Sequence, residues 1–243
     1  MSALEKNDPA HSKPEGIDWS LGQWATWVGQ RLGERVETFA RDPDVMISFY
    51  NRELKTIHEY HGRELLELLQ NADDAGVGYG PNKALIELRR DGLCVANSGI
   101  SFSTAGVRSL MIADRSSKQL DRNRYVGNRG LGFRSILNWT TSPAILSGQL
   151  QLGYSPQHAA GQLEQIRAHG SYAQQLVEEQ VRIGHKCPIP VLSCPMILTT
   201  ESLNMPLQKR ALELSAEGYD TVIVLPFTRE RAYEQVKDQI DDL

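Results

Sequence analysis

The residues best placed to do chemistry lie at positions 64–75, which read Glu-Leu-Leu-Glu-Leu-Leu-Gln-Asn-Ala-Asp-Asp-Ala. On a helix, at roughly 100° per residue, Glu67, Asn71 and Asp74 share one narrow stripe, and the leucines spread over the opposite side. An acid and an amide four residues apart are neighbours on a helix. Both side chains could therefore point into one cavity while the leucines fix the helix against a core. The same pattern is also typical of an ordinary amphipathic helix with a solvated face.

A second informative stretch covers residues 127–135, Gly-Asn-Arg-Gly-Leu-Gly-Phe-Arg-Ser. Glycines spaced Gly-x-x-Gly-x-Gly directly before a predicted helix allow backbone N–H groups to turn inward, with the positive end of the helix dipole behind them. Such a nest can hold a phosphate group, and Arg129 and Arg134 could add charge-assisted hydrogen bonds. Many glycine-rich turns bind nothing, so this stretch alone is a weak signal. Residues 113–125, just before it, are dense in charge and serine and are interpreted as a mobile surface loop.

The elements that must position these residues can be read from the spacing of apolar side chains. Residues 1–16 carry two prolines and several charges, which is typical of a flexible tail. Apolar side chains then recur at helical spacing over residues 19–39, with Asp18 as the predicted N-cap. Pro43 ends this helix, and residues 45–60 are predicted to form a further helix that leads to the central one.

A β-hairpin is predicted after the central helix. Residues 84–89 and 93–96 are apolar runs on either side of Asp91-Gly92, which is the strongest short-range hairpin signal. The hairpin leads into Asn97-Ser-Gly99, a turn whose glycine lets the backbone approach a ligand closely. We therefore expect the polar stripe of the central helix and this turn to belong to one site.

The second half of the chain repeats the hairpin pattern and adds a long helical region. Apolar runs at residues 144–146 and 150–152 predict a second hairpin. The nearly continuous apolar run at 218–227 indicates a strand near the centre of a sheet. Residues 157–216 are mainly helical and are interpreted as an insertion, and residues 229–243 are predicted to form a C-terminal helix that could begin a further region.

Composition narrows the class of protein. A chain of 243 residues with a net charge of −4 is long enough for one large domain, and its acidic balance gives no electrostatic reason to expect a nucleic-acid partner. The three cysteines include no Cys-x-x-Cys pair, which indicates reduced thiols and a cytoplasmic location. No signal peptide and no run of about 18 apolar residues is found, so we expect no membrane partner.

Three of these stretches come in the order used by the GHKL ATP-binding superfamily, which includes gyrase, heat-shock chaperones, histidine kinases and MutL. They are Glu67-Leu-Leu-Gln-Asn71-Ala-Asp-Asp74-Ala75, Asn97-Ser-Gly99 after a strand, and Gly127-Asn-Arg-Gly130-Leu-Gly132-Phe133 before a helix. Within the superfamily the chain most resembles the sacsin-like branch, through Leu-Leu-Gln-Asn-Ala-Asp-Asp-Ala and Gly-Leu-Gly-Phe-Arg-Ser. The resemblance covers residues 59–140 closely and 218–227 loosely.

The resemblance implies a role for each matched residue. Glu67 would activate the attacking water, and the side-chain oxygen of Asn71 would hold Mg²⁺. The implied ATP-binding set consists of Asn71, Asp74, Ala75, Asn97, Gly99, Gly127, Arg129, Gly130, Leu131, Gly132, Phe133 and Thr221. Elementary chemistry agrees, because Mg²⁺ needs few protein ligands beside waters and phosphates, and a base one helical turn away can reach the water.

Two positions depart from the superfamily pattern. Asn97 stands where many members have an aspartate that accepts the adenine amino proton. An amide oxygen can accept that bond, but its NH₂ group then needs another partner. Ser101 replaces a second glycine found in several branches. Glu64 is a rival carboxylate, interpreted as a surface residue or a support outside the site because it lies about 60° from Glu67 on the helix.

We therefore predict an α+β protein with a two-layer α/β sandwich of the Bergerat type, in which helices cover one face of a mixed, mainly antiparallel sheet. One ATP-binding domain is expected over residues 17–228. The expected function is Mg²⁺-dependent ATP binding and slow hydrolysis, used as a conformational switch for a protein partner, an attached domain or a second copy in a homodimer. Two alternatives remain open, a nucleotide-binding regulatory module without significant turnover and a histidine kinase-type catalytic domain.

Overall fold

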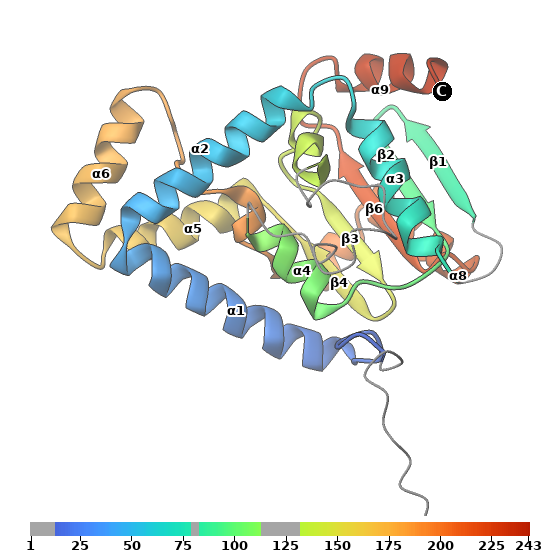
Figure 1. The fold of residues 1–243 in the computed structure, drawn as a ribbon, viewed down its shortest axis with the longest axis horizontal. Helices are drawn as coiled ribbons and strands as arrows, with labels where there is room; N and C mark the ends of the chain where they lie inside the picture. Colours follow the sequence, from blue (N-terminus) through green and yellow to red (C-terminus); the bar gives the residue numbers. More distant parts are fainter. Residues whose placement is uncertain (1–12, 79–82, 113–131) are drawn as a thin grey trace, which may run out of the picture.

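The computed structural model describes residues 13–78, 83–112 and 132–243, and an antiparallel sheet lies at its centre (Figure 1). Its strands are β1 (Ala84–Arg89), β2 (Gly92–Asn97), β3 (Ala144–Ser147), β4 (Leu150–Gly153), β5 (Met196–Ile197) and β6 (Thr221–Pro226). They lie in the order β1-β2-β6-β3-β4-β5, and every neighbouring pair is antiparallel. Both predicted hairpins are confirmed, and β6 lies between them as its continuous apolar run predicts.

Helices make up most of the remaining chain. They are α1 (Leu21–Arg41), α2 (Pro43–Glu59), α3 (Glu64–Gly76), α4 (Thr104–Met111), α5 (Pro156–Arg167), α6 (Ser171–Arg182), α7 (Thr200–Leu203), α8 (Pro206–Ala216) and α9 (Ala232–Asp241). The described residues also form the 3₁₀ helices η3 (Gly132–Asn138) and η4 (Val191–Ser193). The helix predicted after the glycine-rich stretch is thus a 3₁₀ helix, whose tighter turns bring the chain from the helical layer to β3 within a few residues.

The start of α1 differs from the prediction. Ser20, and not Asp18, is the N-cap, because its hydroxyl accepts the backbone N–H of Gln23 while the Gln23 side chain accepts the backbone N–H of Ser20 at 2.9 Å. This reciprocal capping box satisfies two backbone donors that the first helical turn leaves open. Asp18 instead pairs with Lys13 at 3.1 Å.

The sheet separates two apolar layers. Leu93 and Val95 of β2, with Ile223 and Leu225 of β6, face a helical layer built from α1, α3, α4 and η3. The alternate residues of the same strands face α8 on the other side, as the period of two along a strand requires. The two-layer α/β arrangement around an antiparallel sheet is confirmed, and α8 adds one helix on the second face (Figure 1).

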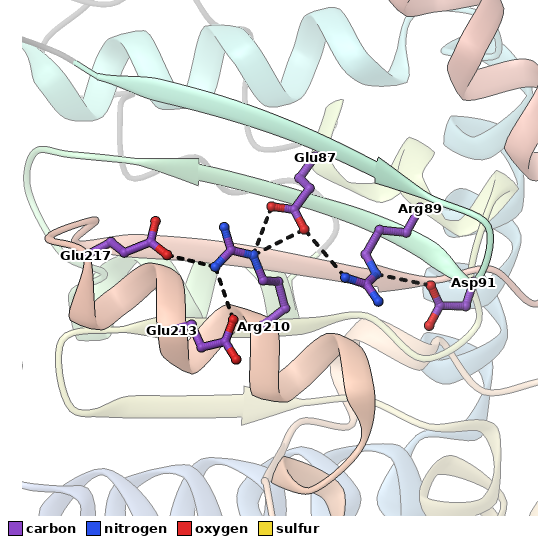
Figure 2. A network of polar contacts seen from close by, with 6 residues as sticks. All are labelled: Glu87, Arg89, Asp91, Arg210, Glu213 and Glu217. Carbon is purple, nitrogen blue, oxygen red and sulfur yellow. Dashed lines mark hydrogen bonds and ion pairs between the residues drawn. The ribbon is translucent and has the colours of Figure 1, made fainter.

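An ionic network fixes α8 across β1 on this second face (Figure 2). The Nε of Arg210 donates to both carboxylate oxygens of Glu87, at 3.1 and 2.9 Å. Its Nη1 donates to Glu213 at 3.1 Å and to Glu217 at 2.7 Å. These hydrogen bonds raise the pKa of the Arg210 guanidinium above its ordinary value. Because the network lies near the surface, it orients α8 more than it stabilises the fold.

The region predicted as an insertion, residues 157–216, contributes to two different apolar cores. Ala159, Leu163 and Ile166 of α5, with residues of α6, form a separate core with Phe39 of α1 and Met46 of α2. The later part of the region, α8, covers the sheet. Within the described part of the chain, none of the helices has the length and apolar character that a membrane span requires.

A buried polar knot holds the start of α3. Glu64 is 0% exposed, and its carboxylate accepts hydrogen bonds from Asn138 at 2.8 Å and from Gln239 at 2.7 Å. His61 lies 3.2 Å from the same carboxylate. The side-chain oxygen of Gln239 in turn accepts the backbone N–H of Leu65 at 3.0 Å. Glu64 is therefore not a surface residue, but a support that joins α3 to η3 and α9.

The knot predicts a large loss of stability for Glu64→Ala. The variant removes a fully buried carboxylate that accepts hydrogen bonds from the half-buried amides of Asn138 and Gln239, so the free energy of unfolding should fall by about 2 to 4 kcal/mol in urea titrations. The matched control is Asp73→Ala, an exposed acid on the same helix, which should change it by less than about 0.5 kcal/mol. Equal losses in the two variants would show that the knot does not anchor α3.

Candidate functional site

The polar stripe of α3 faces the interior of the protein. Glu67 and Asp74 are each only 7% exposed, and Asn71 between them is partly exposed. On the far side of the helix Leu65 and Leu68 enter the main core. Most of the stripe is therefore not a solvated face, and an acid that is withdrawn from water in this way needs polar surroundings.

The backbone of Gly132 lies directly against the Glu67 carboxylate. A methyl group added at position 132 would come within 1.8 Å of Glu67 Oε2 and 2.4 Å of its Cδ. Any residue other than glycine at position 132 would require the Glu67 carboxylate to move, so the close contact explains the glycine at this position. The next residue, Phe133, has its side chain in the main core and anchors the chain at this point.

The other predicted residues of the glycine-rich stretch are Gly127, Arg129, Gly130 and Leu131. They lie outside the described residues. Arg134, which the sequence suggested as a phosphate ligand, is 1% exposed, and its Nη2 donates to the carbonyl oxygen of Leu110 at 2.6 Å. The guanidinium is thus inside the protein, where it joins η3 to α4.

Three buried polar side chains lie at the ends of neighbouring strands of the sheet. Asn97 of β2 pairs in register with Thr221 of β6, and both are buried. Thr221 Oγ1 lies 2.6 Å from the hydroxyl of Ser147, at the end of β3. Each of the three residues lies two positions from an apolar residue of the main core on its own strand, Val95, Ile223 or Ile145, so their side chains face the same layer as α3. Ser147 was not predicted, and its position at the end of a predicted strand, directly before Gly148, was the available signal.

The amide of Asn97 is oriented by its own turn. Its Nδ2 donates to the backbone carbonyl of Ser98 at 3.1 Å. This bond gives the NH₂ group the partner that the sequence left open, and it leaves Oδ1 as the acceptor of the side chain. At this position the amide can therefore take the accepting role of a carboxylate.

The turn after β2 lies against the end of α3. The Gly99 φ angle is +132°, and a methyl group there would come within 2.2 Å of the Ala75 carbonyl oxygen. The N–H of Ile100 donates to that oxygen at 2.8 Å, and the N–H of Gly99 donates to the carboxylate of Asp220 at 2.9 Å. Asp220 was also not predicted, because only the pairing of β2 with β6 brings it to this turn.

Two backbone glycines therefore meet α3 at separate points. Gly132 meets it at Glu67 and Gly99 meets it at Ala75, eight residues further along. At 1.5 Å per residue these points are about 12 Å apart along the axis. Glu67 and Asn71 thus lie towards one of these points, and the Asn97 oxygen and the two hydroxyl groups lie on the strands that lead to the other. Within the described residues, His, Cys, Asp and Glu do not gather in groups of three or more that could hold a metal by themselves.

Comparison with known proteins gives limited similarity. No protein-family model matches the chain. Protein NO VEIN from Arabidopsis thaliana is 28% identical over 164 residues, which cover 67% of this chain. The chain spans 5% of the length of that curated relative. The match shows a similar region in a far longer protein and assigns no activity to it.

The Gly99 turn predicts a strong steric effect of one methyl group. Gly99→Ala must strain a positive φ and displace the end of α3, so it should lower the free energy of unfolding by about 3 kcal/mol. The matched control is Gly218→Ala, which also has a positive φ, of +97°, but no atom within 4 Å. Gly218→Ala should lower the free energy of unfolding only by the backbone strain of the positive φ, about 1 kcal/mol. A similar loss in both variants would contradict the close approach of Gly99 to Ala75.

Proposed function

We propose that this chain is an Mg²⁺-dependent ATP-binding domain of the GHKL type, close to the sacsin-like and heat-shock chaperone branches, that hydrolyses ATP slowly. The observation that carries the proposal is the pair of close backbone approaches to α3, Gly132 at Glu67 and Gly99 at Ala75. These glycines belong to the two motifs that suggested the superfamily, and they meet the helix that carries the third. The antiparallel sheet with its helical layer is compatible with the same assignment.

The phosphate end of the ligand belongs, in this proposal, at Glu67 and Gly132. The Gly132 backbone lies against Glu67 and fixes its position, and in this proposal the Glu67 carboxylate would orient a water and accept its proton. Asn71, one helical turn further on and partly exposed, would give its side-chain oxygen to Mg²⁺. A bound Mg²⁺ supplies charge that compensates the phosphates during hydrolysis.

The base end belongs at Asn97, Thr221 and Ser147. Asn97 offers an accepting oxygen, and the two hydroxyls share one hydrogen bond, which leaves one O–H able to donate. Ser147 Oγ also accepts the backbone N–H of Phe102 at 2.9 Å. An acceptor beside a donor matches the amino group and ring nitrogen of adenine, whereas guanine presents a carbonyl oxygen in place of the amino group. Adenine is therefore favoured although Asn97 replaces the usual aspartate.

The consequence of binding would be a change of conformation. Nucleotide switches act by holding a segment in one arrangement while the phosphates are bound and releasing it afterwards. In this proposal the change is received by a protein partner, an attached domain or a second copy of the chain, in the cytoplasm. The presence of Asn97, where many superfamily members have an aspartate, also favours a second candidate function. This function is a regulatory module that binds the nucleotide without significant turnover.

Glu67→Ala separates these functions. The variant removes the proposed base but leaves Asn71 and the base end, so phosphate release should fall by at least about 100-fold. The dissociation constant for ATP with Mg²⁺, measured by calorimetry, should stay within about threefold of the parent. Asp73→Ala, exposed on the same helix, is the control and should keep the parent rate.

Two outcomes count against ATP hydrolysis by this site. If Glu67→Ala releases phosphate at the parent rate, the catalytic role of Glu67 is wrong. If the parent binds ATP but releases phosphate no faster than a protein-free blank, the regulatory module is the correct function.

A further inference from the structure

A buried carboxylate, Glu53, and a buried guanidinium, Arg134, lie near the proposed site, and neither has a role in the proposed binding of the nucleotide. Glu53 of α2 is 4% exposed and Arg134 of η3 is 1% exposed. The Glu53 carboxylate accepts the backbone N–H groups of Val191 at 2.8 Å and Leu192 at 3.3 Å. Glu53 thereby joins α2 to η4, two segments far apart in the sequence.

Arg134 ties the start of η3 to the neighbouring helix. It lies two residues after Gly132, and its Nη2 donates to the Leu110 carbonyl oxygen in the last turn of α4 at 2.6 Å. The end of α4 is held from a second side, because Ser193 of η4 donates to the Met111 carbonyl oxygen at 2.9 Å. The elements α2, α4, η3 and η4 thus meet around one acid and one base.

Burial and the charge of the other residue act in opposite directions on the pKa of each group. Burial raises the pKa of the Glu53 carboxyl, while the charge of Arg134 and the two backbone N–H groups act in the opposite direction. Burial lowers the pKa of the Arg134 guanidinium, and Glu53 opposes that change. Removing the Glu53 charge leaves the backbone N–H groups of Val191 and Leu192 without their charged acceptor, and this weakens the joint between α2 and η4.

We propose that Glu53 and Arg134 are positioning residues that hold η3 so that the Gly132 backbone stays against the Glu67 carboxylate. The connection is short, because the Ser135 hydroxyl donates to the Gly132 carbonyl oxygen at 2.5 Å within the same 3₁₀ helix. A shift of η3 is therefore passed directly to Gly132. The inference rests on the proposed function for its ligand, whereas its geometry can be tested without one.

The first arm of the test uses the ligand-free protein. Glu53→Gln keeps the size of the side chain but removes its charge, and hydrogen–deuterium exchange of the peptide 132–138 should rise by at least about tenfold. Exchange in β2 and β6 should stay unchanged. Glu59→Gln, an exposed position on the same helix, is the matched control and should alter neither region. No change in η3, or an equal rise throughout the sheet, would overturn the inference.

The second arm measures ATP hydrolysis with Mg²⁺. Because Glu53 acts through the geometry of Gly132 and Glu67, Glu53→Gln should lower kcat by at least about tenfold, since small misplacements of catalytic groups are costly. The KM should change by less than about threefold, because the base end at Asn97 is untouched. An unchanged kcat in a variant with loosened η3 would overturn the positioning role. If the parent itself neither binds nor hydrolyses ATP, the proposed function fails, while the exchange arm still decides the inference.

Discussion

The structure depends on one constraint, which is the close contact of the backbone at Gly132 and at Gly99 with α3. Leu65 and Leu68 of α3 enter the core, and Gly132 at Glu67 and the Gly99 turn at Ala75 lie against the polar stripe and the end of the helix. Neither approach tolerates a methyl group without movement. The Glu67 carboxylate and the end of α3 are therefore held at defined places, and the remaining elements serve to keep the two segments there.

That support comes from polar groups that are buried away from the site. The Glu64 knot joins α3 to η3 and α9, and the Glu53–Arg134 cluster joins η3 to α2, α4 and η4. Buried charges of this kind add little net stability, but they are satisfied in only one arrangement. These clusters therefore specify the position of η3, while the burial of the apolar cores supplies most of the favourable free energy of folding.

Local signals in the sequence were sufficient for most of the fold. The hairpin at Asp91-Gly92 follows from turn chemistry, and the position of β6 follows from an apolar run that needs burial on both faces. Local signals of this kind do not predict contacts between residues that are far apart in the sequence. Arg134 was read as a phosphate ligand because it follows a glycine-rich stretch, and its burial depends on elements distant in sequence. Ser147 and Asp220 join the site only through strand pairing.

The central claim is that one elongated nucleotide touches both ends of α3. Its most direct test is a nuclear magnetic resonance titration of the isotope-labelled protein with ATP and Mg²⁺, following the backbone amides of Gly132 and Gly99. The account predicts that both signals move along one binding curve with a single dissociation constant. If neither signal moves at saturating ATP, or if only one of them does, the two ends of α3 do not form one nucleotide site.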